Sequence, residues 1–383
     1  MSGHKRIKAR SGAGLACLSM VLLAGFGPTS SVPSASTAWR VVASTRTIFI
    51  PEVVATSRHS AWALGGGFSL AQPQSDFPAA LHWNGHTWSK VGPASFPKAI
   101  RSTGFGCAGA SSAANVWAFA GTTNSGGFAD AAGALRLEAG RWKLVKRFPA
   151  GIVTGCLVES PTEIWVFGDA HVAPGVGTWH LHGRTWERVV SGNYALDSAS
   201  AVSADDVWAE GADGFLNPVV AHWNGRMWAR NTKLARMLPK TSANLELFLS
   251  GITALRRNDV WFRVEVDRNP AGHPTFSAIV LHWNGRVWHR ASPTEFGYYL
   301  PGAVRDGHGG WWADVFVNSS KRLVLHSVGD RWFRVPVSVH GCPAGQLYRL
   351  APVPGATSVL GLQTCPAKSA PPVINVLLHG PRL

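Results

Sequence analysis

The chain has 383 residues, of which 46% are hydrophobic and 15% charged, with 42 Gly, 24 Pro and 18 Trp. Because an average chain carries about 25% charged residues, this composition excludes an intrinsically disordered protein. The formal charge of +15 comes from Lys and Arg that are scattered along the chain. They form no basic stripe, so nucleic-acid binding has little support.

The first 38 residues have the pattern of a secretory signal peptide followed by a spacer. Four Lys and Arg at positions 5–10 precede an apolar run at about 12–27 and a Ser/Pro/Ala stretch at 28–38. This order predicts a cleavage site within residues 27–38 and a secreted, extracellular protein, with an uncleaved N-terminal anchor as the alternative. No later segment is long enough for a transmembrane helix. Without the basic head, 32 Lys and Arg face 21 Asp and Glu, and this charge of +11 favours contact with anionic envelope polymers.

Two motifs recur along the rest of the chain. Residues 81–88, 221–228 and 281–288 are near copies of H-W-N-G-x-x-W, and looser copies end at Trp142, Trp186 and Trp332. A second motif, typified by D-V-W-A at 206–209, precedes each copy. The motif Trp residues are Trp62, Trp117, Trp165, Trp208, Trp261 and Trp312.

Each repeat predicts four strands. An apolar strand such as 199–202 leads through a tight polar turn to the V-W-A strand, and a variable loop leads to the strand ending in H-W. The Asn-Gly pair that follows is a strong signal for a hairpin between two apolar strands. Four antiparallel strands repeated every 40 to 50 residues are typical of a β-propeller blade.

The repeat predicts seven blades in a single domain, residues 39–383. Six complete units end at Trp332, and residues 347–351, 358–363 and 373–378 supply three strands of a seventh. Residues 37–42 match a closing strand such as 87–91. We therefore expect the N-terminal strand to complete the C-terminal blade and close the ring, leaving no open sheet edge.

The repeat resembles kelch-type and galactose-oxidase-type propellers. It looks most like exported actinobacterial proteins with recurring D-V-W-A-x-G and H-W-N-G-x-x-W motifs. The resemblance covers nearly the whole predicted domain, and it implies a fold without implying an activity, because one fold hosts many functions.

Repeated aromatic and polar residues are interpreted as structural. The Trp at fixed strand positions are expected to pack blade against blade. Recurring Asp at the first turn, such as Asp206 and Asp259, are expected to cap their own backbone. The five His at one third-strand position are expected to be copies of a single packing contact. These are His82, His180, His222, His282 and His326.

No metal site, cofactor or catalytic residue is predicted. His180 and His182 alternate on one strand, but two ligands fall short of a zinc shell. A galactose-oxidase copper centre needs two Tyr, one of them crosslinked to a Cys, but this chain has only four Tyr and the cysteines of the predicted domain are expected to form disulfides. The Ser and Asp of the sialidase Asp-box turn are absent from the turn at 183–186.

The four cysteines of the predicted domain indicate two disulfides in an oxidising compartment. Cys342 opens the first strand of the seventh blade and Cys365 ends its second, so an antiparallel hairpin places them opposite each other. Cys107 and Cys156 fall at corresponding first-strand positions of adjacent blades, and their pairing needs Cα atoms within about 7 Å.

Loop lengths point to one face as the ligand site. Loops between second and third strands, such as 65–78 and 264–276, and links between blades, such as 231–248, emerge on the same face and are long. Long variable loops are where folds of this kind place binding sites. The polar candidates there are Asp169, His171, Asp213, Arg236, Lys240, Asp267, Arg268, His273, Tyr298 and Tyr299.

The sequence therefore predicts a secreted, monomeric, non-catalytic β-propeller that binds a ligand, with a glycan or cell-envelope polymer as the suggested partner. A propeller glycoside hydrolase or oxidase with an unrecognised site on the propeller axis is one alternative. A purely structural envelope protein is another.

Overall fold

The computed structural model divides the chain into two units, Met1–Ala35 and Ser36–Leu383. The predicted leader lies outside the described residues. No described helix has the length and apolar character needed to cross a membrane. The structure describes residues 38–67, 77–122, 131–169, 175–189, 193–214, 217–242, 244–268, 275–291, 303–318, 321–328, 331–342, 345–366 and 372–380.

The described residues form seven four-stranded antiparallel sheets, which confirms the all-β prediction and the number of blades. Sheet 1 contains β2 (Ile48–Ser57), β3 (Ser60–Gly67), β4 (Phe77–Trp83) and β5 (Trp88–Val91). Sheet 2 contains β6 (Phe105–Ser112), β7 (Asn115–Ala120), β8 (Ala132–Glu138) and β9 (Arg141–Phe148). Sheet 3 contains β10 (Val153–Ser160), β11 (Glu163–Gly168), β12 (Thr178–His182) and β13 (Thr185–Val189). Sheet 4 contains β14 (Tyr194–Ser203), β15 (Asp206–Asp213), β16 (Pro218–Trp223) and β17 (Trp228–Arg230).

The remaining sheets follow the same strand order. Sheet 5 contains β18 (Leu245–Arg256), β19 (Asp259–Arg268), β20 (Thr275–Trp283) and β21 (Trp288–Arg290). Sheet 6 contains β22 (Val304–Arg305), β23 (Trp311–Asn318), β24 (Lys321–Val328) and β25 (Arg331–Val335). Sheet 7 contains β26 (Gln346–Pro352), β27 (Val359–Cys365), β28 (Val373–His379) and β1 (Arg40–Thr45). The short 3-10 helices are Pro93–Ser95, Lys98–Ile100 and Leu234–Met237.

The Asn-Gly turns are built as the sequence requires. In sheet 4 the Asn224 side-chain oxygen accepts hydrogen bonds from the backbone N–H groups of Arg226 and Met227, both at 3.1 Å. Gly225 has a φ of 87°, in the left-handed region that favours glycine. The turn therefore fixes the register in which Trp223 lies opposite Trp228.

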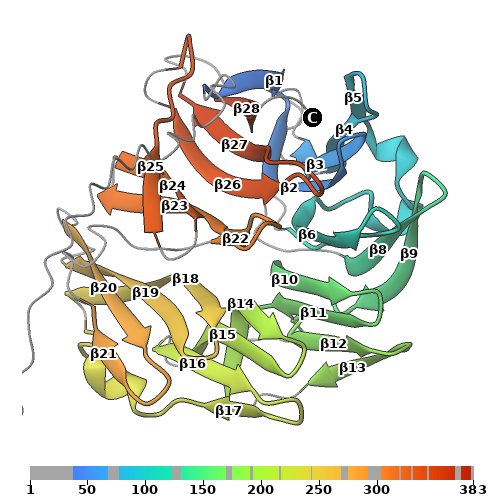
Figure 1. The fold of residues 1–383 in the computed structure, drawn as a ribbon. Coiled ribbons are helices and arrows are strands. Elements are labelled where there is room, and N and C mark those ends of the chain that lie inside the picture. Colours follow the sequence, from blue (N-terminus) through green and yellow to red (C-terminus); the bar gives the residue numbers. More distant parts are fainter. Residues whose placement is uncertain are drawn as a thin grey trace, which may run out of the picture. The chain divides into compact units, whose positions relative to one another are not determined.

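The N-terminal strand lies in the C-terminal sheet. β1 pairs antiparallel with β28, from Arg40 opposite Leu378 to Thr45 opposite Ile374. In Figure 1 the blue β1 lies beside the red β28. The outer edge of β28 is therefore covered by the first described strand of the chain.

Each pair of successive sheets shares a hydrophobic cluster. For example, Trp208 of sheet 4 packs with Phe262 and Trp288 of sheet 5, and Trp312 of sheet 6 packs with Leu347 of sheet 7. Of the thirteen Trp at the two repeated positions, ten are buried and Trp88, Trp186 and Trp332 are half-buried. The expected sheet-to-sheet packing is thus confirmed.

The repeated His also pack as predicted, because each stacks on the motif Trp of its own sheet. The clearest case is His180 on Trp165, with ring centroids 3.7 Å apart and planes 6° apart. The other stacked pairs are His82 with Trp62, His222 with Trp208, His282 with Trp261 and His326 with Trp312.

The turn aspartates differ from expectation. The Asp206 side chain accepts a hydrogen bond from the Trp208 indole N–H at 3.1 Å and bonds to His222 Nε2 at 2.8 Å. Asp259 binds Trp261 and His282 in the same way. These carboxylates thus form hydrogen bonds with both rings of the stacked Trp–His pair. The bonds give partners to ring nitrogen atoms that would otherwise lie unsatisfied in the sheet.

Both predicted disulfides form. Cys342 and Cys365 join within sheet 7 with Cα atoms 5.7 Å apart, and Cys107 and Cys156 join sheets 2 and 3 at 5.8 Å. Cys107 and Cys156 differ by one residue in their place along the first strand. Cys107 lies opposite Phe119, two residues after the motif Trp, whereas Cys156 lies opposite Val166, one residue after it. That offset corrects the expectation of equivalent positions.

Candidate functional site

A cavity of about 890 Å³ is lined by residues from the first strands of all seven sheets. We call it the first-strand cavity. Its wall includes the Cys107–Cys156 disulfide. It reaches Glu159 near the end of β10, and also Gly307 and Pro354 beyond the ends of β22 and β26. The cavity therefore extends to the ends of the sheets that carry the turns between first and second strands, opposite the predicted long-loop face.

A repeated irregularity in the first strands shapes the cavity wall. Six first strands have a register shift within their first half, and the residue after each shift lines the cavity. A β-bulge of this kind bends the strand and re-aims its side chains. The residues after the shift are Glu52, Cys107, Gly155, Ser198, Gly251 and Arg349.

Glu210 is a buried carboxyl group in this cavity, with 5% of its surface exposed. One oxygen accepts a hydrogen bond from the Ser198 hydroxyl at 2.8 Å, and the other accepts from the Gly251 backbone N–H at 3.2 Å. Burial raises the pKa of Glu210 to about 7, against the lowering effect of the Ser198 bond. The residue can therefore hold or release a proton near neutral pH.

Glu52 is a second buried carboxyl group. Burial raises its pKa to about 7, while the ion pair with the Arg349 guanidinium opposes the rise. Arg349 also donates to the Pro51 carbonyl at 3.3 Å, and the neighbouring Tyr348 hydroxyl donates to the Ile50 carbonyl. These bonds link β26 to β2 at the cavity wall.

Other charged groups complete the lining. The surrounding protein partly desolvates the Glu159 carboxyl group and so raises its pKa, although the residue as a whole is exposed. The positive charge of Arg305 opposes that rise. Burial tends to raise the pKa of Asp306, but bonds from the His308 and Gly310 N–H groups and from His326 lower it overall. The acidic lining residues are Glu52, Glu159, Glu210, Asp306 and Asp314, and the basic ones are Arg305 and Arg349. A chain with a formal charge of +15 thus surrounds a cavity with more acidic than basic side chains.

None of the six sequence-predicted candidates among the described residues lines this cavity. Asp213 is buried and forms an ion pair with Arg230 at 3.1 Å, while its other oxygen accepts from the Asn217 backbone N–H. Asn217 also accepts from the Thr241 hydroxyl, which follows the exposed Lys240. Asp213 therefore stabilises the long-loop end of sheet 4.

The other candidates are dispersed. Arg236 is exposed on the helix Leu234–Met237, and Asp169 is half-buried just after β11. Asp267 is buried and Arg268 exposed at the end of β19. Four candidates lie outside the described residues, namely His171, His273, Tyr298 and Tyr299.

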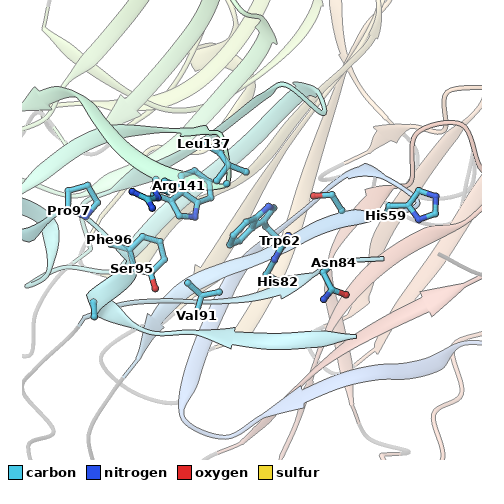
Figure 2. A pocket seen from close by; sticks show the side chains of 14 residues that line it. His59, Trp62, His82, Asn84, Val91, Ser95, Phe96, Pro97, Leu137 and Arg141 are labelled. Atoms are coloured by element: carbon cyan, nitrogen blue, oxygen red, sulfur yellow. The ribbon is translucent and has the colours of Figure 1, made fainter. Parts of the chain in front are cut away.

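A second hollow of about 940 Å³ lies between sheets 1 and 2 (Figure 2). Its wall includes the stacked Trp62 and His82, with Phe96 and Arg141 nearby. Trp62 also packs edge-on against Trp142, with centroids 5.2 Å apart. Because these aromatic residues belong to the repeated packing, the first-strand cavity, with its non-repeated charged residues, is the stronger candidate site.

Sequence reasoning missed the residues of this cavity, although one signal was available. Glu210 and Asp314 both stand two residues after the motif Trp, where sheets 1 to 3 carry Leu64, Phe119 and Phe167. Aligning the repeats on that Trp exposes the two acids as exceptions within an apolar column.

Comparison with known proteins shows the class of fold. No family model matches the chain, and no curated protein sequence matches it. A structure of YCF48 bound to a D1 peptide is 13% identical over 89% of this chain and 96% of that chain, with a TM-score of 0.52. The GH74 xyloglucanase of Xanthomonas campestris is 13% identical over 88% of this chain and 55% of that chain, with a TM-score of 0.52.

A third structure is described as a propeller. The Swd1 β-propeller domain of Myceliophteria thermophila is 8% identical over 88% of this chain and 99% of that chain, with a TM-score of 0.48. The seven four-stranded antiparallel sheets place the chain in the β-propeller class, and the YCF48 and xyloglucanase structures are similar to it in fold. At such low identity the likeness concerns the fold alone.

Proposed function

We propose that this protein is an exported β-propeller that binds a glycan in the first-strand cavity without transforming it. The observation that carries the proposal is the acidic lining of that cavity in a basic protein. Carboxyl groups with a pKa near 7 can both donate and accept hydrogen bonds to sugar hydroxyls. An excess of carboxylates favours a neutral or amino-bearing glycan over an anionic one.

The signal-peptide pattern and the two disulfides support an extracellular location, because disulfides persist in oxidising compartments. The basic residues elsewhere on the molecule fit contact with anionic envelope polymers. The repeat motifs support kinship with the exported actinobacterial propellers. The hydrophobic clusters shared by successive sheets, including the one between sheets 7 and 1, together with the β1–β28 pairing, support a closed ring over residues 39–383.

A glycan array probed with residues 39–383 tests the binding site. We expect neutral or amino-bearing glycans to bind, and Glu210→Gln and Arg349→Ala to weaken binding at least tenfold. Glu138→Gln is the control, because Glu138 is a half-buried residue that pairs with Lys143 on sheet 2 and does not line the cavity. Equal binding by wild type and the Glu210→Gln variant would place the ligand elsewhere, with the long-loop residues as the next surface to mutate.

A glycoside hydrolase is the second candidate, because two glutamates with a pKa near 7 line the same cavity. A raised carboxyl pKa is the property required of the general acid in such enzymes. Incubating the protein with the array's best glycans and analysing products by mass spectrometry separates the candidates. Cleavage that is lost in both Glu52→Gln and Glu210→Gln supports the hydrolase, and intact glycan supports the binding protein.

A further inference from the structure

A cluster of three potential metal ligands lies on sheet 3, apart from the first-strand cavity. Glu163 is the first residue of β11, and His180 and His182 lie on β12. Glu163 and His182 are direct cross-strand neighbours. One ligand atom from each of the three side chains lies within 4.8 Å of the other two.

The cluster is a modified copy of the repeated Trp–Asp–His packing. In sheet 4 one oxygen of Asp206 bonds to both the Trp208 indole and His222. In sheet 3 the equivalent residue is Glu163, whose two oxygens instead contact His180 Nε2 and His182 Nδ1, the latter at 3.0 Å. Glu163, whose side chain is longer than that of Asp206, thus contacts a second imidazole where Asp206 contacts an indole.

His182 replaces a residue that serves the turn in other sheets. At its position, sheets 1, 4 and 5 carry Asn84, Asn224 and Asn284, whose side-chain oxygens accept hydrogen bonds from the following backbone N–H groups. His182 directs Nδ1 to Glu163 instead. The turn of sheet 3 therefore has no Asn side chain to accept these bonds. In its place an imidazole, a group that can bind metal ions, lies beside the Glu163 carboxylate.

The geometry is suited to a metal ion. Stacking on Trp165 fixes the ring plane of His180, which is 7% exposed. The His182 side chain is 79% exposed, so the cluster opens to solvent on that side. Two imidazoles and one carboxylate form a donor set that zinc uses with three protein ligands, the fourth position being taken by water.

We propose that Glu163, His180 and His182 bind one divalent transition-metal ion, with Zn²⁺ as the favoured cation. The side-chain atoms that now bond to each other are those that coordinate the metal. The site is independent of the glycan site, because none of the three residues lines the first-strand cavity.

Calorimetric titration of residues 39–383, purified without a polyhistidine tag, with Zn²⁺ tests the site. We expect one equivalent to bind. The variant His182→Asn, which restores the residue found in sheets 1, 4 and 5, should weaken binding at least about 100-fold, because losing a group that merely hydrogen-bonds to a metal ligand already costs about 10–100-fold. His86→Asn, at an exposed turn position of sheet 1, is the control and should bind as wild type does. Unchanged affinity in His182→Asn would overturn the proposal.

Cobalt substitution provides a readout that needs no variant. Co²⁺ bound by the three residues should give visible absorption bands of a four- or five-coordinate nitrogen–oxygen site, displaced by one equivalent of Zn²⁺. A spectrum equal to that of aqueous Co²⁺ would also overturn the proposal, whether or not the His182→Asn variant folds.

Discussion

At the scale of single residues, two of the acids that line the first-strand cavity, Glu210 and Asp314, are exceptions to a repeat. The position two residues after the motif Trp is apolar in most sheets, and a charged residue there faces a buried environment. Sheets 4, 5 and 6 carry three consecutive exceptions, all at most 7% exposed. Across the seven sheets the residues are Leu64, Phe119, Phe167, Glu210, Arg263, Asp314 and Leu362.

The raised pKa of Glu210 predicts a pH-dependent stability. Its carboxyl group titrates near 7 in the folded protein and near 4.5 when unfolded. Between these values the folded state holds a proton that the unfolded state releases, so the free energy of unfolding falls as the pH rises. The full shift corresponds to about 3 kcal/mol.

Glu210→Gln mimics the protonated group and removes this dependence. Its amide can still be bonded, because the Ser198 hydroxyl can donate or accept. In urea titrations we expect the variant to be more stable than wild type at pH 8 and equal to it near pH 4.5. The control Glu138→Gln should gain no stability at pH 8. A difference of the same size at both pH values would contradict the assignment.

At the scale of elements, the repeat motifs determine the strands and turns of each sheet. The register shifts in the first strands shape the wall of the first-strand cavity. Strand order, Asn-Gly turns, disulfide pairing and the stacked His were all predictable, because each depends on local spacing or a recurring contact. The acidic lining was not, because its members lie on several sheets and are brought together only when those sheets assemble. Glu163 was missed for a related reason, since its relation to His182 is a cross-strand register.

Close strand approach leaves no room for a Cβ at two second-strand glycines, Gly211 and Gly65. A Cβ on Gly211 would lie 1.8 Å from the Ala195 carbonyl oxygen, a backbone atom held by the β14–β15 pairing. Gly65 meets the Phe49 carbonyl in the same way in sheet 1.

We expect Gly211→Ala to lower the free energy of unfolding by about 1–3 kcal/mol, the range typical of overpacking. Chemical denaturation measures the loss. Gly214→Ala is the matched control, because a Cβ there meets no atom within 4 Å. Equal stability of the two variants would show that β14 can move away from β15.

At the scale of the whole molecule, β1 is required to complete sheet 7. Without it the backbone of β28 would present an unpaired edge, which promotes aggregation. Because Arg40 lies opposite Leu378, the start of β1 and the end of β28 are neighbours that a short turn can join.

A circular permutant tests this arrangement. Residues 47–380 joined by a short Gly-Ser linker to residues 39–46 should fold with a melting temperature within a few degrees of the wild type. Residues 47–380 alone should aggregate or melt at a much lower temperature. Equal melting temperatures for the permutant and the truncated chain would show that sheet 7 does not need its fourth strand.

The β1–β28 pairing also orders the events of folding. A ribosome makes β1 first and β28 last, and the bonded pair Ser44 and Asn375 are 331 positions apart. Contacts between such distant segments form slowly, because a long loop must close before they contribute free energy. β1 therefore has no partner strand until β28 has been made, and sheet 7 is complete only when these two segments meet.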